Sequence, residues 1–281
     1  MACKEHLIKV MPCREQRKRL MKRRLLLVGL SGVLLSACTP TWTIPPTLGD
    51  QKNAPPYGYT PLDPLPVAVQ ATGTLTNARL LKALPDDTMR LAIGQFDGNA
   101  NISYGPAKVG VAGNTYVVVI DYIKSDTRSF GVKVTALPNQ SRQIALASGP
   151  DATSVVPVYI GVGLRLTATL FVVSGSVELT NLFAIGAAAA AKQVSGTLTI
   201  QTLGVSGEGI STIIPIPTEI SASSIQNAIQ SLGSIKAKLY DDKTSITPQV
   251  VGVYNTIGGG AETINGFISS LLTQPLVLRV P

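Results

Sequence analysis

Histidine and cysteine, the two side chains that most often serve catalysis and transition-metal binding, are nearly absent from this sequence. The single histidine is His6 and the last of three cysteines is Cys38, so residues 39–281 contain neither an imidazole nor a thiol. That part of the chain therefore cannot hold a Ser-His-Asp triad, a Cys-His nucleophile or a Cys/His zinc site. We expect no catalytic residue, no metal and no cofactor, and we predict a protein that is not an enzyme.

Charged and aromatic residues are also scarce. Only 14% of the 281 residues are charged and 5% are aromatic, whereas 45% are hydrophobic. Such a chain is too apolar to be disordered, and its charge-free stretches are too short for a bundle of membrane helices. Three cysteines are too few for a disulfide framework.

The net charge of +8 is concentrated at the N-terminus. Residues 1–37 hold nine of the 24 Lys and Arg and two of the 16 Asp and Glu, a net of +7, which leaves +1 for residues 38–281. A nucleic-acid partner is therefore not expected, because the rest of the chain has no surplus of positive charge to neutralise phosphates.

Carboxylates are the main remaining candidates for chemistry, and two adjacent pairs are present. Asp86-Asp87 and Asp241-Asp242 both stand in turn-like contexts, LPDDT and YDDKTS. Neighbouring residues of a strand point to opposite faces, so neither pair is suited to joint acid and base catalysis. Both are predicted to be solvated turn residues.

The basic N-terminus has the form of an export signal. Lys22-Arg23-Arg24 precedes the apolar stretch LLLVGLSGVLLSA of residues 25–37. As a helix this stretch would be about 20 Å long, short of the roughly 30 Å hydrocarbon core of a bilayer. The pattern is typical of a signal peptide. Met21 directly precedes the basic run, which leaves open whether translation starts at Met1 or at Met21.

The end of the apolar stretch, Leu35-Ser36-Ala37-Cys38, resembles the lipobox of bacterial lipoproteins. The resemblance implies that Cys38 is acylated and becomes the first residue after cleavage of the signal peptide, 1–37. An ordinary signal peptide that happens to meet a cysteine is the alternative. Thr39, where an Asp would retain such proteins at the inner membrane, implies an outer-membrane location facing the periplasm.

Residues 38–66 are predicted to form the lipid anchor and a proline-rich tether. Eight prolines fall between Thr39 and Pro66. Because proline lacks a backbone donor and fixes φ, we expect this stretch to form no lasting strand or helix.

Residues 67–281 show the two-residue period of β-strands. Tyr116–Ile123 and Phe130–Ala136 are predicted strands, and every even position of Val156–Leu170 is apolar. Phe171–Leu179 alternates with the opposite parity, which predicts a bulge near Leu170. Arg165 stands on the polar side of this long strand, either as an anion-binding residue or as part of a solvated face.

Three helices are predicted in the C-terminal half, and further strands lie around them. The helices are 181–193, 221–232 and 261–272, where apolar residues recur on one face. Strands are expected at 194–201, 235–240 and 250–254, the last two as a hairpin across Asp241–Pro248. The result is an α+β fold, mostly antiparallel, in one body of residues 67–281, with a division near residue 150 left open.

Three functions fit these patterns. The first is a lipid-anchored cell-envelope protein with a non-enzymatic binding or structural role and an envelope protein as its partner. The second is a homo-oligomeric outer-membrane pore or secretion complex to which each subunit adds an amphipathic β-hairpin from residues 156–179. The third is an envelope hydrolase that works with carboxylates.

Overall fold

The computed structural model of the chain describes residues 58–96, 102–105, 108–136, 142–258 and 260–281. Cys38, the predicted signal peptide and most of the predicted tether lie outside these residues, so those predictions stay untested. The described part is largely antiparallel β-structure with some helices, which agrees with the predicted class. In this part of the chain, no helix is both long and apolar enough to cross a membrane.

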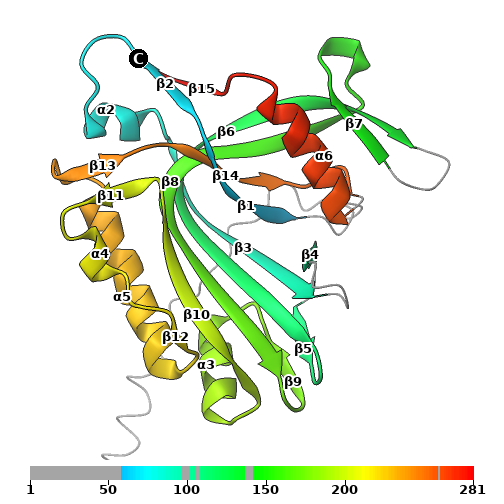
Figure 1. Cartoon of the computed structure of the whole chain (residues 1–281), viewed down its shortest axis with the longest axis vertical. Helices are drawn as coiled ribbons and strands as arrows, with labels where there is room; N and C mark the ends of the chain where they lie inside the picture. Colours follow the sequence, from blue (N-terminus) through cyan, green and yellow to red (C-terminus); the bar gives the residue numbers. More distant parts are fainter. Residues whose placement is uncertain (1–57, 97–101, 106–107, 137–141, 259) are drawn as a thin grey trace, which may run out of the picture. The chain divides into compact units, whose positions relative to one another are not determined.

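Two long strands, β6 (Thr115–Ala136) and β8 (Ser154–Val172), form the centre of the main sheet (Figure 1). They pair antiparallel without interruption from Thr115 opposite Phe171 to Val132 opposite Ser154. The two predicted strands 116–123 and 130–136 are therefore parts of one strand. β6 and β8, which precede and follow residue 150, pair with each other and belong to one sheet.

One edge of β6 pairs with one edge of β8, and the other edge of each strand pairs with two shorter strands in succession. β6 pairs with β3 (Asp86–Phe96) and then with β7 (Arg142–Leu146), and β8 pairs with β14 (Gln249–Tyr254) and then with β10 (Val194–Leu203). The sheet thus has one half built on β3, β6, β8 and β10 and another built on β7, β6, β8 and β14.

Short strands complete the sheet and form three small ribbons. The sheet continues with β1 (Tyr59–Pro66) beside β14, β4 (Ile102–Gly105) beside β3 and β12 (Thr218–Glu219) beside β10. The ribbons are β5 (Val109–Val111) with β9 (Ser176–Glu178), β11 (Val205–Gly207) with β13 (Thr244–Ile246), and β2 (Ala68–Ala71) parallel to β15 (Val277–Val280).

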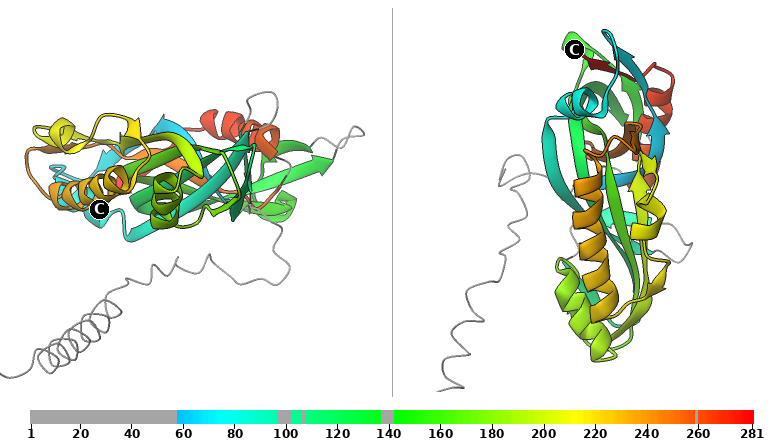
Figure 2. Two further views of the ribbon diagram at one scale, coloured as in Figure 1. Left: turned by 90° about the horizontal axis from the view of Figure 1, so that it is seen from below. Right: turned by 90° about the vertical axis from the view of Figure 1, so that its left-hand side faces the viewer.

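Five α-helices are described, two more than predicted. They are α2 (Asn77–Lys82), α3 (Leu182–Ala190), α4 (Ile210–Ile213), α5 (Ala222–Lys238) and α6 (Gly260–Leu272). The three predicted helices correspond to α3, α5 and α6. Figures 1 and 2 show α5 running beside β8 and β10, and α6 lying against β7.

The main core lies on the face of β8 that carries the even positions. From Val156 to Leu170, every even-numbered side chain is at most 2% exposed, as the alternation predicts. These side chains pack in one cluster with Ile185 of α3 and Ile225 and Ile235 of α5. A sheet covered by helices on this face explains why the apolar period is so regular.

The opposite face of β8 was expected to be exposed to water, and this is wrong for its middle. Tyr159 is 1% exposed and belongs to a second apolar cluster with Tyr59, Val119 and Val251. β1 and β14 supply Tyr59 and Val251, so they cover this face. Toward both ends of β8 this face is more open, because Val155 and Phe171 are exposed and Pro157, Thr167 and Thr169 are partly exposed.

The predicted tether extended to Pro66, but Tyr59–Pro66 forms β1 and pairs with β14. The strand lies at the edge of the sheet, where a residue without a backbone N–H is tolerated on the side that has no neighbour. The register also shifts between Pro61 and Leu65. Edge position and irregular register together accommodate three prolines.

The strand predicted at Ile235–Tyr240 is wrong, because α5 continues through Gly233 to Lys238. Ile235 and Leu239, four residues apart, are both almost fully buried, which a helix achieves by placing them on one face. Their burial outweighs the cost of about 1 kcal/mol for a glycine inside a helix. The predicted hairpin therefore does not form, and β14 pairs with β1 and β8 instead.

The change of parity after Leu170 was expected to continue the strand past a bulge, but β8 ends at Val172. Phe171 and Val173 are about half exposed, whereas Val177 and Leu179 are buried after a turn at Gly175. The turn separates two strands, and this accounts for the new parity.

Candidate binding cleft

A buried ion pair lies in the middle of the sheet, where Asp121 of β6 is opposite Arg165 of β8. Arg165 Nε donates to Asp121 Oδ1 at 2.7 Å, and Nη2 donates to Oδ2 at 2.6 Å. The remaining acceptors are backbone carbonyls, those of Leu62 in β1 at 2.7 Å and Val251 in β14 at 2.8 Å. Asp121 is 0% and Arg165 7% exposed, so the pair is shielded from water.

Tyr59, the first residue of β1, covers this ion pair. Its hydroxyl donates to Asp121 Oδ2, and its ring lies edge-on to Tyr159 with centroids 5.7 Å apart. The ring lies over Gly252, where any Cβ would overlap it. Glycine at 252 is thus needed for the first residue of β1 to reach the ion pair.

Burial and neighbouring charges determine the protonation of Tyr59 and Arg165. Burial raises the pKa of Tyr59 well above its usual value, and the neighbouring Asp121 carboxylate raises it further. Burial by itself would lower the pKa of Arg165, but the hydrogen bonds and the charge of Asp121, together with Tyr59, outweigh it and the pKa is raised. At neutral pH the hydroxyl is therefore protonated and the guanidinium charged.

Beside this network a cleft of about 600 Å³ opens on the same face of the sheet. Its floor is apolar and comes from three adjacent strands: Phe96 of β3, Ile102 and Tyr104 of β4, and Val117 and Val119 of β6. One flank is polar and neutral, with Thr167 and Thr169 of β8 and Gln201 of β10. The facing wall is Thr60–Asp63 of β1 with Asn255, Ile264 and Asn265.

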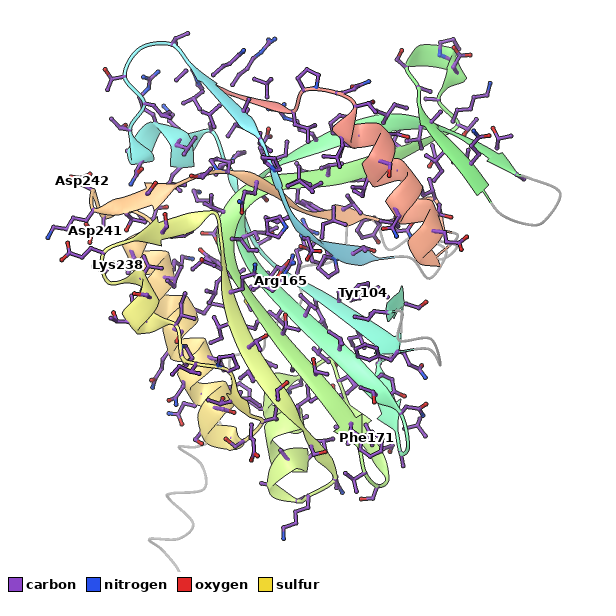
Figure 3. All side chains as sticks on the ribbon, in the orientation of Figure 1. Tyr104, Arg165, Phe171, Lys238, Asp241 and Asp242 are labelled. Carbon is purple, nitrogen blue, oxygen red and sulfur yellow. The ribbon has the colours of Figure 1, made fainter. Side chains whose placement is uncertain are left out.

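The floor is arranged by cross-strand pairing. Gly94 of β3 lies between Tyr104 and Val117 in the ladder, so these three residues share one face. A Cβ at Gly94 would lie 3.2 Å from the Tyr104 ring, and the missing side chain lets the ring lie against the sheet. Figure 3 shows Tyr104 and Arg165 on neighbouring parts of the sheet, with Phe171 at its far end.

Tyr104 is a neutral hydrogen-bonding group at this floor. Burial raises its pKa, and Asp121 and Asp63 raise it further against the lowering effect of Arg165. Its hydroxyl is therefore protonated at neutral pH. On the facing wall, the Asn255 side-chain oxygen accepts the N–H groups of Ile257 and Gly258 at 3.1 and 2.9 Å, which fixes the amide in place.

Arg165 is the one predicted site residue that the described chain contains, and it lines the cleft. The prediction of a solvated face is wrong, because the side chain is buried. The anion that Arg165 binds in this structure is Asp121 of its own chain, and binding of an external anion stays a prediction. The predicted lipidation site, Cys38, lies outside the described residues.

The acidic pairs are not brought together. Asp86 and Asp87 begin β3 rather than a turn, and Asp87 pairs with Lys236 at 3.2 Å. Asp241 follows α5 and pairs with Lys238 at 2.9 Å, in the turn that was predicted (Figure 3). Among the described residues, no group of three or more His, Cys, Asp or Glu could hold a metal ion.

A second, smaller cavity of about 480 Å³ lies where β10 and β14 separate along β8. It is lined mainly by short polar residues and backbone, among them Thr202, Gly204, Ser206 and Thr247. It lacks the aromatic floor of the larger cleft, and we regard the larger cleft as the candidate site.

Neither the role of Asp121 nor the cleft was predicted from the sequence. Asp121 did carry a signal, since an acidic residue inside the apolar run YVVVIDYI must find a partner when buried. The cleft carried none, because its residues come from six strands and a helix that are remote in the sequence.

Comparisons with protein-family models, with curated proteins and with solved structures give no match.

Proposed function

We propose that this protein is a lipid-anchored protein of the bacterial cell envelope that binds an envelope component in the cleft without catalysing a reaction. The proposed lipid anchor rests on the lipobox-like motif Leu35-Ser36-Ala37-Cys38, and the proposed binding role rests on the cleft. The outer membrane, with the body facing the periplasm, is the location that Thr39 supports.

The chemistry of the cleft is the single observation that carries the binding role. Among the described residues that line it, only Asp63 and Arg165 are ionic, and Arg165 already directs four N–H groups at Asp121 and two carbonyls. General acid–base catalysis needs a titratable group poised to exchange a proton near neutral pH. An apolar floor with a few polar groups around it is instead typical of a binding site.

No observation favours the pore alternative over this proposal. The segment expected to form a membrane hairpin contains β8, whose two sides are both paired within the sheet. Its even positions pack against helices of the same chain, which supports a role in the protein core.

The anchor is tested by replacing Cys38 with alanine in cells that express the full chain. The lipobox resemblance predicts that acyl labelling disappears and that the protein leaves the membrane fraction or accumulates unprocessed. Equal labelling of the variant and the unchanged protein would contradict the anchor.

The binding role is tested with a photo-crosslinking amino acid at position 201 or, as a control, at position 226. Gln201 is exposed and lines the cleft, whereas Gln226 is exposed on α5 and does not. We expect an adduct with an envelope component from position 201 alone. The absence of any adduct there, or the same adduct at both positions, would contradict binding in the cleft.

A further inference from the structure

We infer that the cleft binds a neutral, short oligosaccharide. This inference rests on the proposed binding function and adds the chemical class of the ligand. It follows from four features of the cleft: its charge, its hydrogen-bonding groups, the state of the strands beneath it, and its size.

The charge of the cleft disfavours an anionic ligand. Arg165, the one cation among the described residues that line the cleft, is paired with Asp121 and shielded by Tyr59. Asp63 on the facing wall is exposed and would repel a carboxylate or a phosphate. A ligand that carries no negative charge avoids this repulsion and does not compete with Asp121 for the guanidinium.

The hydrogen-bonding groups disfavour a plain hydrocarbon chain. Thr167, Thr169, Gln201 and Asn265 present hydroxyls and amides to the cleft. Covering such groups without giving them partners costs about 1–3 kcal/mol for each group. The ligand must therefore carry hydroxyl or amide groups along one side.

The strands beneath the cleft disfavour a peptide bound as an added strand. β6 is paired with β3 and β8 over the floor residues, and β8 is paired with β6 and β10 next to them. The backbone groups of β6 and β8 are used within the sheet, so strand addition, which requires a free edge, could occur only at outer strands such as β4 and β1 and not over β6 and β8.

A sugar ring has the complementary pair of surfaces. Its C–H face can pack on the rings of Tyr104 and Phe96, and its hydroxyls can bond to the neutral amides and hydroxyls on the flank. The volume of about 600 Å³ falls within the roughly 300–1,000 Å³ of small-ligand sites and leaves room for more than one ring.

The test uses the full chain, purified in a polyoxyethylene detergent because such detergents have no sugar head group. Maltotriose, cellotriose and chitotriose are titrated in turn by calorimetry. We expect at least one to bind with a Kd of about 1 mM or tighter. Tyr104→Ala should weaken that binding at least about tenfold, which corresponds to about 1.4 kcal/mol.

The matched control is Tyr240→Ala, since Tyr240 is exposed and does not line the cleft. It should leave the Kd unchanged. Tyr104→Phe keeps the ring and should retain most of the binding, which separates loss of the ring from misfolding. Failure of all three trisaccharides to bind, or equal weakening by Tyr104→Ala and Tyr240→Ala, would overturn the inference.

The crosslink from position 201 distinguishes this inference from the function on which it rests. An adduct that a glycosidase shortens supports both. An adduct whose added mass a glycosidase leaves unchanged overturns the sugar ligand and leaves binding in the cleft intact, whereas no adduct at all contradicts the binding function itself.

Discussion

At the scale of single residues, the Tyr59–Asp121–Arg165 network is the most consequential feature. A buried ion pair contributes little net stability compared with an apolar pair, but loss of one partner leaves a charge without compensation. Asp121 accepts from both other members, so it is the residue on which the network depends.

We predict that Asp121→Ala lowers the free energy of unfolding by about 3–5 kcal/mol, because it leaves the Arg165 guanidinium buried without its carboxylate. Urea denaturation of the full chain measures this loss. The double variant Asp121→Leu with Arg165→Met should recover much of it. A loss below about 1 kcal/mol in the single variant would indicate a pair that is open to water.

The raised pKa of Tyr59 predicts that stability falls in alkaline solution. The unfolded chain releases this proton near pH 10, whereas the folded chain holds it to a higher pH, so the stabilisation is complete below about pH 10 and is lost as the pH rises further. Tyr59→Phe cannot ionise, and its unfolding free energy should fall less steeply above pH 10. The slope above pH 10 is also measured for Tyr104→Phe as a comparison, because the pKa of Tyr104 is raised as well. Identical slopes for wild type and Tyr59→Phe would contradict the prediction.

At the scale of elements, α5 shows how tertiary packing extends a helix past its sequence signal. Ser221 caps the helix by accepting from the Ser224 N–H at 3.1 Å, and the Ser224 hydroxyl accepts in return from the Ser221 N–H at 2.9 Å. Gly233 was expected to end it. The burial of Ile235, two residues after Gly233, keeps the chain helical.

We predict that Gly233→Ala stabilises the protein by about 0.5–1 kcal/mol, because alanine favours the helix and restricts the unfolded chain. A Cβ at position 233 would meet nothing within 4 Å. Gly186→Ala in α3 is the control, since its Cβ would lie 3.1 Å from Ile225 Cδ1, and it should gain less or lose stability. Denaturation of both variants under one condition gives the comparison, and destabilisation by Gly233→Ala would refute the prediction.

The elements also show which sequence patterns were informative. Alternation along Val156–Leu170 gave the buried face of β8 correctly at every even position, because one continuous core lies against it. The odd positions could not be predicted, because their burial depends on Tyr59 and Val251, which come from strands far away in the sequence. Arg165 was accordingly placed on the right face of the strand and in the wrong environment.

At the scale of the whole molecule, the two ends of the sequence differ in how far they could be predicted. The C-terminal helices follow local rules for caps and apolar faces, and all three were found. The beginning of the body was drawn at residue 67 because prolines were taken to exclude a strand, although an edge strand tolerates them. The cleft depends on the meeting of six strands, which no single stretch of the sequence specifies.

We predict that the fold of the whole chain needs neither a metal nor a disulfide, because residues 39–281 contain no cysteine and no histidine. Chelator and reductant added together should leave its Tm unchanged. The same additions to a zinc-dependent protein serve as the positive control. A fall of several degrees with chelator alone would reveal a site built from oxygen ligands.

The position of β1 determines how the molecule responds to mechanical load. A force applied to the chain before Tyr59 acts on the end of β1. If backbone hydrogen bonds to β14 were the only contacts of β1, they would break one after another from this end. In this protein the hydroxyl of Tyr59, the first residue of β1, donates a hydrogen bond to Asp121, and the carbonyl of Leu62 accepts one from Arg165. Residues Thr60–Asp63, which follow Tyr59 and include Leu62, form a wall of the cleft. Force transmitted from the N-terminal side is therefore borne first by the bond from Tyr59 to Asp121, and it reaches the wall of the cleft only after that bond breaks. A ligand that bridges the wall and the floor would add a further restraint behind this bond.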